Sequence, residues 1–92
     1  MAELIASGTA AANSADFTVL SGSPVNISLH DADGVFSNDV DATVFIKSSA
    51  GVYRAVSGGN LSAQRAELVI DGPGTYRVTK YASVVAFGVD KD

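Results

Sequence analysis

The chain contains no cysteine among its 92 residues. This absence excludes disulfide bonds, thiolate metal sites and cysteine nucleophiles, and it is typical of proteins made in a reducing compartment. Histidine occurs once, as His30, so a catalytic triad would have a single residue available as its base. Stability must therefore come from packing, and a chain of this length supports one small core rather than a second domain or a deep cleft.

Motifs for enzymatic chemistry are also missing. The sequence has no Gly-x-Ser-x-Gly elbow, no Cys/His pair and no glycine-rich phosphate loop. His30 stands at the end of a predicted strand beside Asp31, where we expect a solvated side chain rather than a catalytic base. We therefore expect no enzyme, and a hydrolytic activity lost on changing His30 or Asp31 to Ala would contradict this.

Positive charge is scarce and long apolar runs are absent. Ten acidic and six basic side chains give a net charge of −4. The basic residues are scattered along the chain rather than gathered in a stripe, so we expect no nucleic-acid binding. The longest apolar run, Val84–Phe87, is far too short to span a membrane, and residues 1–8 predict no secretory signal.

What the chain does contain is a succession of short runs rich in Val, Ile, Thr, Phe and Tyr, separated by clusters of Gly, Pro, Asn, Asp and Ser. This spacing predicts an all-β protein, a single small antiparallel β-sandwich of immunoglobulin-like or jelly-roll-like type with about seven to eight strands. We predict strands over residues 15–21, 25–30, 42–48, 51–56, 66–71, 74–80 and 83–89, with 4–9 as an eighth. Residues 1–15 form an N-terminal arm or edge strand, and 16–92 form the domain.

Alternation of apolar and polar residues within these runs predicts which side chains face the core. The predicted core residues are Phe17, Val19, Ile27, Leu29, Val44, Ile46, Leu68, Ile70, Tyr76 and Val78. Tyr76 follows the turn Asp71-Gly72-Pro73-Gly74, where its hydroxyl can bond back to the backbone as in the tyrosine corner of immunoglobulin-like sandwiches. This corner predicts a folding device and not a binding site.

The last predicted strand carries apolar residues on both faces. Such a strand is either central and covered twice, or its second face contacts another molecule. We predict an intersubunit contact that also involves the N-terminal arm. The predicted interface residues are Leu4, Ile5, Val85, Phe87 and Val89.

One acidic segment, residues 30–41, has an Asp-x-Asp-Gly opening that is typical of calcium-binding loops. An EF-hand starting at Asp31 is excluded, because Phe36 and Ala42 stand where that motif needs Gly and Glu. The weak calcium candidates are Asp31, Asp33, Asp39 and Asp41. The alternative is that these residues are present because Asp and Asn favour turns and keep a long loop soluble.

Several segments, read in order, resemble a known family. They are Ser7-Gly8-Thr9-Ala10-Ala11 with Asp16-Phe17-Thr18-Val19, Pro24-Val25-Asn26-Ile27-Ser28-Leu29, Val69-Ile70-Asp71-Gly72-Pro73-Gly74-Thr75-Tyr76-Arg77-Val78 and Val84-Val85-Ala86-Phe87-Gly88-Val89-Asp90. Together they span nearly the whole chain, which resembles the small β-sandwich head decoration, or cement, proteins of tailed bacteriophages. The Pro-Gly-Thr-Tyr-x-Val corner is also similar to bacterial immunoglobulin-like and PKD-like modules.

This resemblance implies a virion structural protein on the outer capsid surface, made in the bacterial host cytoplasm. It implies a homotrimer that binds and stabilises the major capsid protein, without a cofactor. The rival hypothesis is a glycan-binding or adhesion module on a virion or bacterial surface. Tyr53 and Tyr81 are the aromatic residues that a sugar site would use, and a clustered aromatic groove would distinguish this rival from a cement protein.

Overall fold

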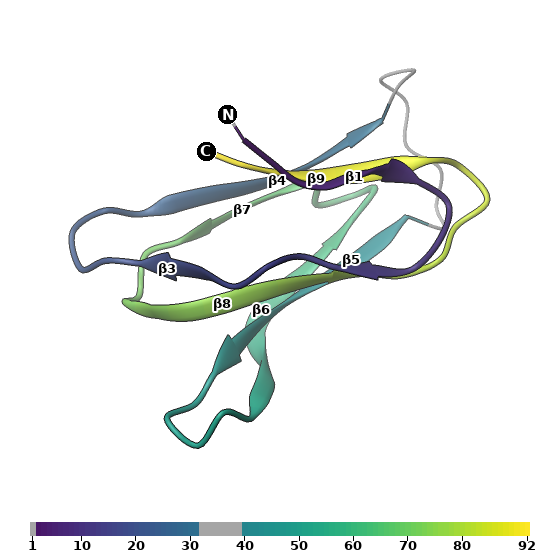
Figure 1. Cartoon of the computed structure of the whole chain (residues 1–92). Helices are drawn as coiled ribbons and strands as arrows, with labels where there is room; N and C mark the ends of the chain where they lie inside the picture. The colour runs from purple at the N-terminus through teal and green to yellow at the C-terminus, as the bar shows by residue number, and fades with distance from the viewer. Residues whose placement is uncertain (1, 32–39) are drawn as a thin grey trace.

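The computed structural model describes residues 2–31 and 40–92, except for the side chains of Ala2 and Asp31. These residues form nine β-strands in two antiparallel sheets that pack face to face (Figure 1), so the predicted all-β sandwich is confirmed. Within the described residues there is no helix with the length and hydropathy needed to cross a membrane. The strands are β1 (Ala2–Gly8), β2 (Ala12–Asn13), β3 (Phe17–Val19), β4 (Val25–Asp31), β5 (Asp41–Lys47), β6 (Tyr53–Ser62), β7 (Glu67–Ile70), β8 (Gly74–Lys80) and β9 (Phe87–Lys91).

Neighbouring strands in each sheet come from distant parts of the chain. The first sheet has the order β1-β9-β4-β7, and the second has the order β2-β8-β5-β6 with β3 also paired to β8. The chain crosses repeatedly between the sheets, and the pairing of β1 with β9 brings the two termini side by side (Figure 1). Strands β6 and β7 are the edges on one side of the sandwich, and this placement positions the groove described below.

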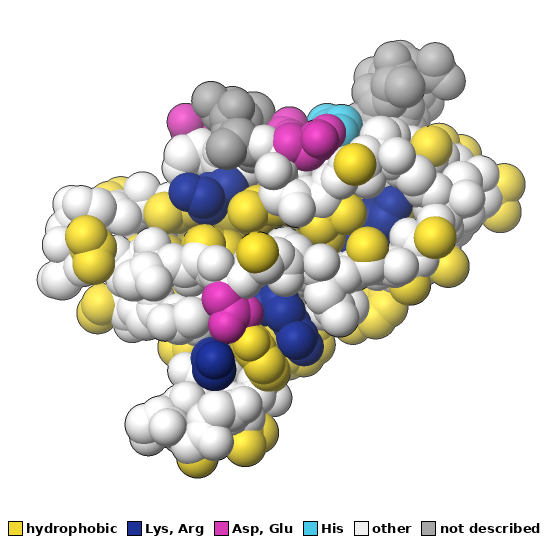
Figure 2. Space-filling view, in the orientation of Figure 1, with side chains coloured by type: hydrophobic (Ala, Val, Ile, Leu, Met, Phe, Trp, Pro, Cys, Tyr) yellow, Lys and Arg dark blue, Asp and Glu magenta, His cyan; other side chains and the backbone are white. Residues whose placement is uncertain are grey.

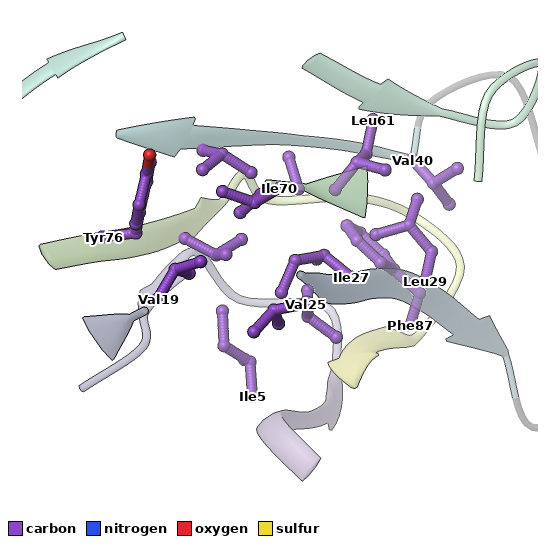
Figure 3. Packing of buried hydrophobic residues seen from close by; sticks show 14 residues of the cluster. Ile5, Val19, Val25, Ile27, Leu29, Val40, Leu61, Ile70, Tyr76 and Phe87 are labelled. Carbon is purple, nitrogen blue, oxygen red and sulfur yellow. The ribbon is translucent and has the colours of Figure 1, made fainter. Parts of the chain in front are cut away.

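The core follows from alternation within the strands, because the inward-facing residues of both sheets meet between them (Figure 3). Seven of the predicted core residues are buried, and Phe17, Ile46 and Leu68 are partly buried against them. The buried apolar residues are Ile5, Val19, Val25, Ile27, Leu29, Val40, Ala42, Val44, Leu61, Ile70, Tyr76, Val78, Phe87 and Val89.

The tyrosine corner predicted from the sequence is confirmed. The Tyr76 hydroxyl donates a hydrogen bond of 2.8 Å to the carbonyl oxygen of Gly72, four residues earlier. Its ring stacks on Phe17 with the centroids 6.1 Å apart. This residue therefore ties the turn between β7 and β8 to the core and to the neighbouring strand β3.

Strand β2 was not predicted, and two predicted strand boundaries differ from the structure by four residues or more. The run Ser57-Gly58-Gly59-Asn60, read as a separator, lies inside β6, which continues to Ser62. Strand β9 begins at Phe87 rather than at residue 83, because the preceding segment crosses from one sheet to the other. The backbone N–H of Ser83 bonds to the Thr9 carbonyl at 2.9 Å instead of joining a ladder.

Candidate protein-binding groove

A groove of about 400 Å³ lies between the two edge strands β6 and β7. Its walls are formed by β6, by β7 and by the turns at either end of β7. The lining residues are Val56, Ser57, Gly58, Arg65, Leu68, Val69, Ile70, Asp71, Gly72 and Tyr76.

A bulge in β6 opens this groove. Strand β5 pairs with β6 at Thr43↔Asn60 and next at Phe45↔Ala55, so four residues of β6, 56–59, lie opposite the single residue Val44 and three of them are extra. Gly58 adopts a φ of 72°, a conformation that residues with a side chain rarely adopt. Two adjacent glycines therefore allow an edge strand to curve away from its partner at this point.

The groove has an apolar floor and charged ends. Ile70 is buried, Leu68 and Val56 are partly buried against the core, and Val69 is 60% exposed at the rim. The turn between β6 and β7 places Arg65 over the bulge, with its Nη1 atom 3.7 Å from where a side chain at Gly58 would begin. Asp71 contributes the opposite charge from the turn after β7.

This arrangement suits contact with a polypeptide better than chemistry on a small molecule. The Tyr76 hydroxyl that lines the groove is already bonded to Gly72, so it is not a spare donor. An apolar floor between opposite charges can accept an apolar side chain of a partner whose neighbouring residues are polar. Edge strands also offer backbone N–H and C=O groups for pairing with an extended segment.

A polar cluster lies on the outer face of the second sheet, away from the groove. The Tyr53 hydroxyl donates to the two oxygens of Asp16 at 2.7 and 2.9 Å, and Lys47 lies 3.5 Å from the same carboxylate. This hydrogen bond lowers the pKa of Asp16 and raises the pKa of Tyr53. The Arg77 guanidinium stacks 3.8 Å from the Tyr53 ring centroid, while its buried Nε atom makes no hydrogen bond with a described residue.

Lys80 is buried inside the sandwich, with only 1% of its surface exposed. Its ammonium group donates to the carbonyl oxygens of Gly8 and Phe87 and lies 4.7 Å from the Phe87 ring centroid. Burial lowers the pKa of Lys80. The residue connects β8 of one sheet to the ends of β1 and β9 in the other. The sequence could have predicted this inward position, because Lys80 lies two and four residues after the inward-facing Val78 and Tyr76 in the same strand.

His30 is not the solvated strand-end residue that the sequence predicted, because its side chain is only 29% exposed. It lies between two carboxylates, with Nδ1 3.1 Å from Asp90 Oδ2 and Nε2 3.5 Å from Glu3 Oε2. Figure 2 shows the histidine beside acidic side chains at the surface. Sequence reasoning missed both partners, because they are 27 and 60 residues away and only the pairing of β1 and β4 with β9 brings them together.

The predicted calcium candidates fall mostly outside the described part of the chain. Asp33 and Asp39 are not among the described residues, and neither is the side chain of Asp31. Asp41 begins β5, and its Oδ1 atom accepts a hydrogen bond of 2.6 Å from Asn60. Asp41 is therefore already engaged with β6.

The predicted interface residues lie mainly in the core, which corrects the interpretation of the last strand as an exposed apolar face. Phe87 and Val89 are fully buried and Ile5 is 6% exposed, so these three side chains are not available to a second molecule. The reason is that β9, which lies between β1 and β4, begins only at Phe87 and turns Phe87 and Val89 toward the core. Leu4 is partly buried against the core and Val85 is half-buried.

Comparisons with protein-family models, with curated proteins and with solved structures found no match to this chain.

Proposed function

We propose that the protein is a virion structural protein that binds and stabilises a phage head, and that it holds a capsid protein through the groove between β6 and β7. The observation that carries the binding role is this groove, with its apolar floor, its exposed Val69 and its two edge strands. Isolated apolar residues are normal on a surface, but an apolar floor between unpaired edges favours a protein partner.

The capsid as partner rests on the resemblance of the sequence to phage head decoration proteins. The tyrosine corner of Tyr76 and the β-sandwich agree with that resemblance, although other sandwich families share both features. A net charge of −4 keeps such a protein soluble before assembly. Many copies on one lattice make modest individual contacts collectively strong, so a small groove is sufficient.

We further propose a homotrimer, as the resemblance implies. The interface cannot use Phe87 or Val89, which fill the core. Surface residues of the loop before β9 remain for such a contact, with Val84 87% exposed and Tyr81 39% exposed. A trimer presents three grooves to the capsid at once, which multiplies the effective affinity of each one.

The rival glycan-binding function has one observation in its favour, the cluster around Tyr53. A sugar stacks on an open aromatic face, yet the Arg77 guanidinium lies over the Tyr53 ring and Asp16 occupies its hydroxyl. Phe45, an aromatic residue on the neighbouring strand β5, is half-buried. The face and the hydroxyl of Tyr53 are therefore occupied from within the protein, which disfavours a sugar platform.

Binding to phage heads tests the proposal. Purified protein is mixed with heads of the phage that encodes the chain, and the mixture is sedimented. We expect the protein to pellet with the heads in a saturable ratio and to raise the temperature at which they release DNA. Protein that stays in the supernatant at every ratio would contradict the capsid role, and a glycan array would then test the rival function.

A further inference from the structure

Three strands of the first sheet bring together Glu3, His30 and Asp90 on the outer face. In the register of β1 with β9, Glu3 lies opposite Asp90, and in the register of β4 with β9, His30 lies opposite Gly88. One ligand atom from each of the three side chains lies within 4.8 Å of the others. The groove and its proposed partner lie on other strands, so this cluster is independent of them.

Each ring nitrogen of His30 has one carboxylate at a separation that fits a metal coordination shell. Two ligand atoms held about 2.1 Å from a tetrahedral zinc lie about 3.4 Å apart. Asp90 Oδ2 lies 3.1 Å from Nδ1 and Glu3 Oε2 lies 3.5 Å from Nε2, so whichever nitrogen binds the ion already has one carboxylate at this separation. Glu3 is 55% exposed, so its side chain is free to rotate toward the nitrogen that binds the ion.

One further observation points to a ligand at this place, and another shows how the imidazole ring is held. The Nδ1 atom of His30 is buried and makes no hydrogen bond with a described residue, although Asp90 lies at ion-pair distance. The imidazole ring packs directly on Gly88, because a Cβ at this position would lie 2.5 Å from His30 Cε1 and from the Ile5 carbonyl oxygen. A glycine at this position therefore lets the imidazole lie against the sheet beside both carboxylates.

We propose that Glu3, His30 and Asp90 form a binding site for a divalent transition metal such as zinc. One imidazole with two carboxylates is a donor set that zinc, nickel and copper accept, whereas calcium and magnesium prefer oxygen ligands alone. Water or a group from a neighbouring molecule completes the shell. The ion neutralises two acidic side chains and links β1, β9 and β4, so it fastens the N-terminal edge strand to the sheet.

Zinc titration of the tag-free protein by calorimetry tests this site. His30 is the single histidine and cysteine is absent, so no other imidazole or thiolate competes. We expect one zinc ion per chain, a melting temperature raised by several degrees at saturating zinc, and no comparable effect of calcium. Cobalt(II) in place of zinc should give the visible absorption of a low-coordinate site.

Three variants and one control assign the ligands. We expect His30→Gln to abolish the saturable site, and Glu3→Gln and Asp90→Asn each to weaken zinc at least about tenfold. The matched control is Glu67→Gln, because Glu67 lies on the same face opposite Ser28 but outside the cluster. Its zinc affinity should equal that of the wild type.

A measurement on the wild type covers the case in which His30→Gln does not fold. The NMR signals of the imidazole protons must shift or broaden on addition of zinc, since this ring is the proposed ligand. The proposal is overturned if zinc leaves these signals unchanged, or if His30→Gln and the wild type bind zinc equally. In either case the cluster is an ion pair of His30 with two carboxylates and holds no metal.

Discussion

At the residue scale, Tyr76 shows how much one side chain can determine locally. Its place after Asp71-Gly72-Pro73-Gly74 was sufficient to predict an inward ring and a hydroxyl bonded to the turn, because both depend on residues close by in sequence. Lys80 could have been predicted in the same way from its parity in β8. His30 could not, because its partners are set by strand pairing over long distances in the chain.

Replacing Tyr76 with Phe removes the corner hydrogen bond and keeps the ring. We expect the free energy of unfolding to fall by about 1 kcal/mol, because the Gly72 carbonyl loses its partner. Urea denaturation measures this change. Tyr81→Phe is the matched control, since Tyr81 is 39% exposed, and it should change stability by much less. Equal losses in the two variants would mean that the corner bond contributes nothing specific.

Burial of Lys80 makes stability depend on alkaline pH. Because the pKa of Lys80 is lowered in the folded protein, the unfolded chain binds the proton more tightly. Below the folded pKa, the buried charge therefore lowers the free energy of unfolding by its full amount. This penalty shrinks as the pH rises above the folded pKa, and it is gone above the unfolded value of about 10.5. The unfolding free energy of the wild type relative to Lys80→Met should therefore increase from pH 7 to pH 10.5, as followed by urea denaturation. A constant difference would contradict the buried position of the ammonium group.

At the element scale, alternation predicted most strands because it reflects burial of one face. It failed where a strand departs from its ladder. The pair Gly58-Gly59 signals flexibility, and the sequence does not distinguish a bulge inside β6 from a turn that ends it. The start of β9 was also misplaced, since the segment that crosses to it from β8 is apolar but bonds to Thr9 outside the ladders.

The β6 bulge depends on Gly58 for its backbone conformation. Gly58→Ala should lower the free energy of unfolding by about 1–2 kcal/mol, because alanine disfavours a φ of 72°. Ser57→Ala is the control, as an exposed neighbour in the same bulge. Thermal or urea denaturation of both variants checks this, and an unchanged stability of Gly58→Ala would mean that the bulge relaxes to an ordinary conformation.

At the scale of the whole molecule, the fold class was predictable but the strand order was not. Apolar residues on both faces of the last strand were interpreted as a subunit interface, whereas β9 lies between β1 and β4 with Phe87 and Val89 in the core. A substitution such as Phe87→Asp would therefore unfold the protein rather than separate subunits. The groove between β6 and β7 was likewise invisible, because two edges meet there only after both sheets have packed.

The most direct test of the account is the binding of two exposed-valine variants to phage heads, measured as the dissociation constant by sedimentation. Val69→Asp places a charge at the rim of the groove, and Val52→Asp places the same charge on an exposed valine in the turn before β6, outside the groove and outside the proposed trimer contact. We predict that Val69→Asp weakens binding at least about tenfold, as expected for an apolar contact buried in an interface, while Val52→Asp binds like the wild type. Equal binding of Val69→Asp and the wild type would contradict the groove as the capsid-binding site.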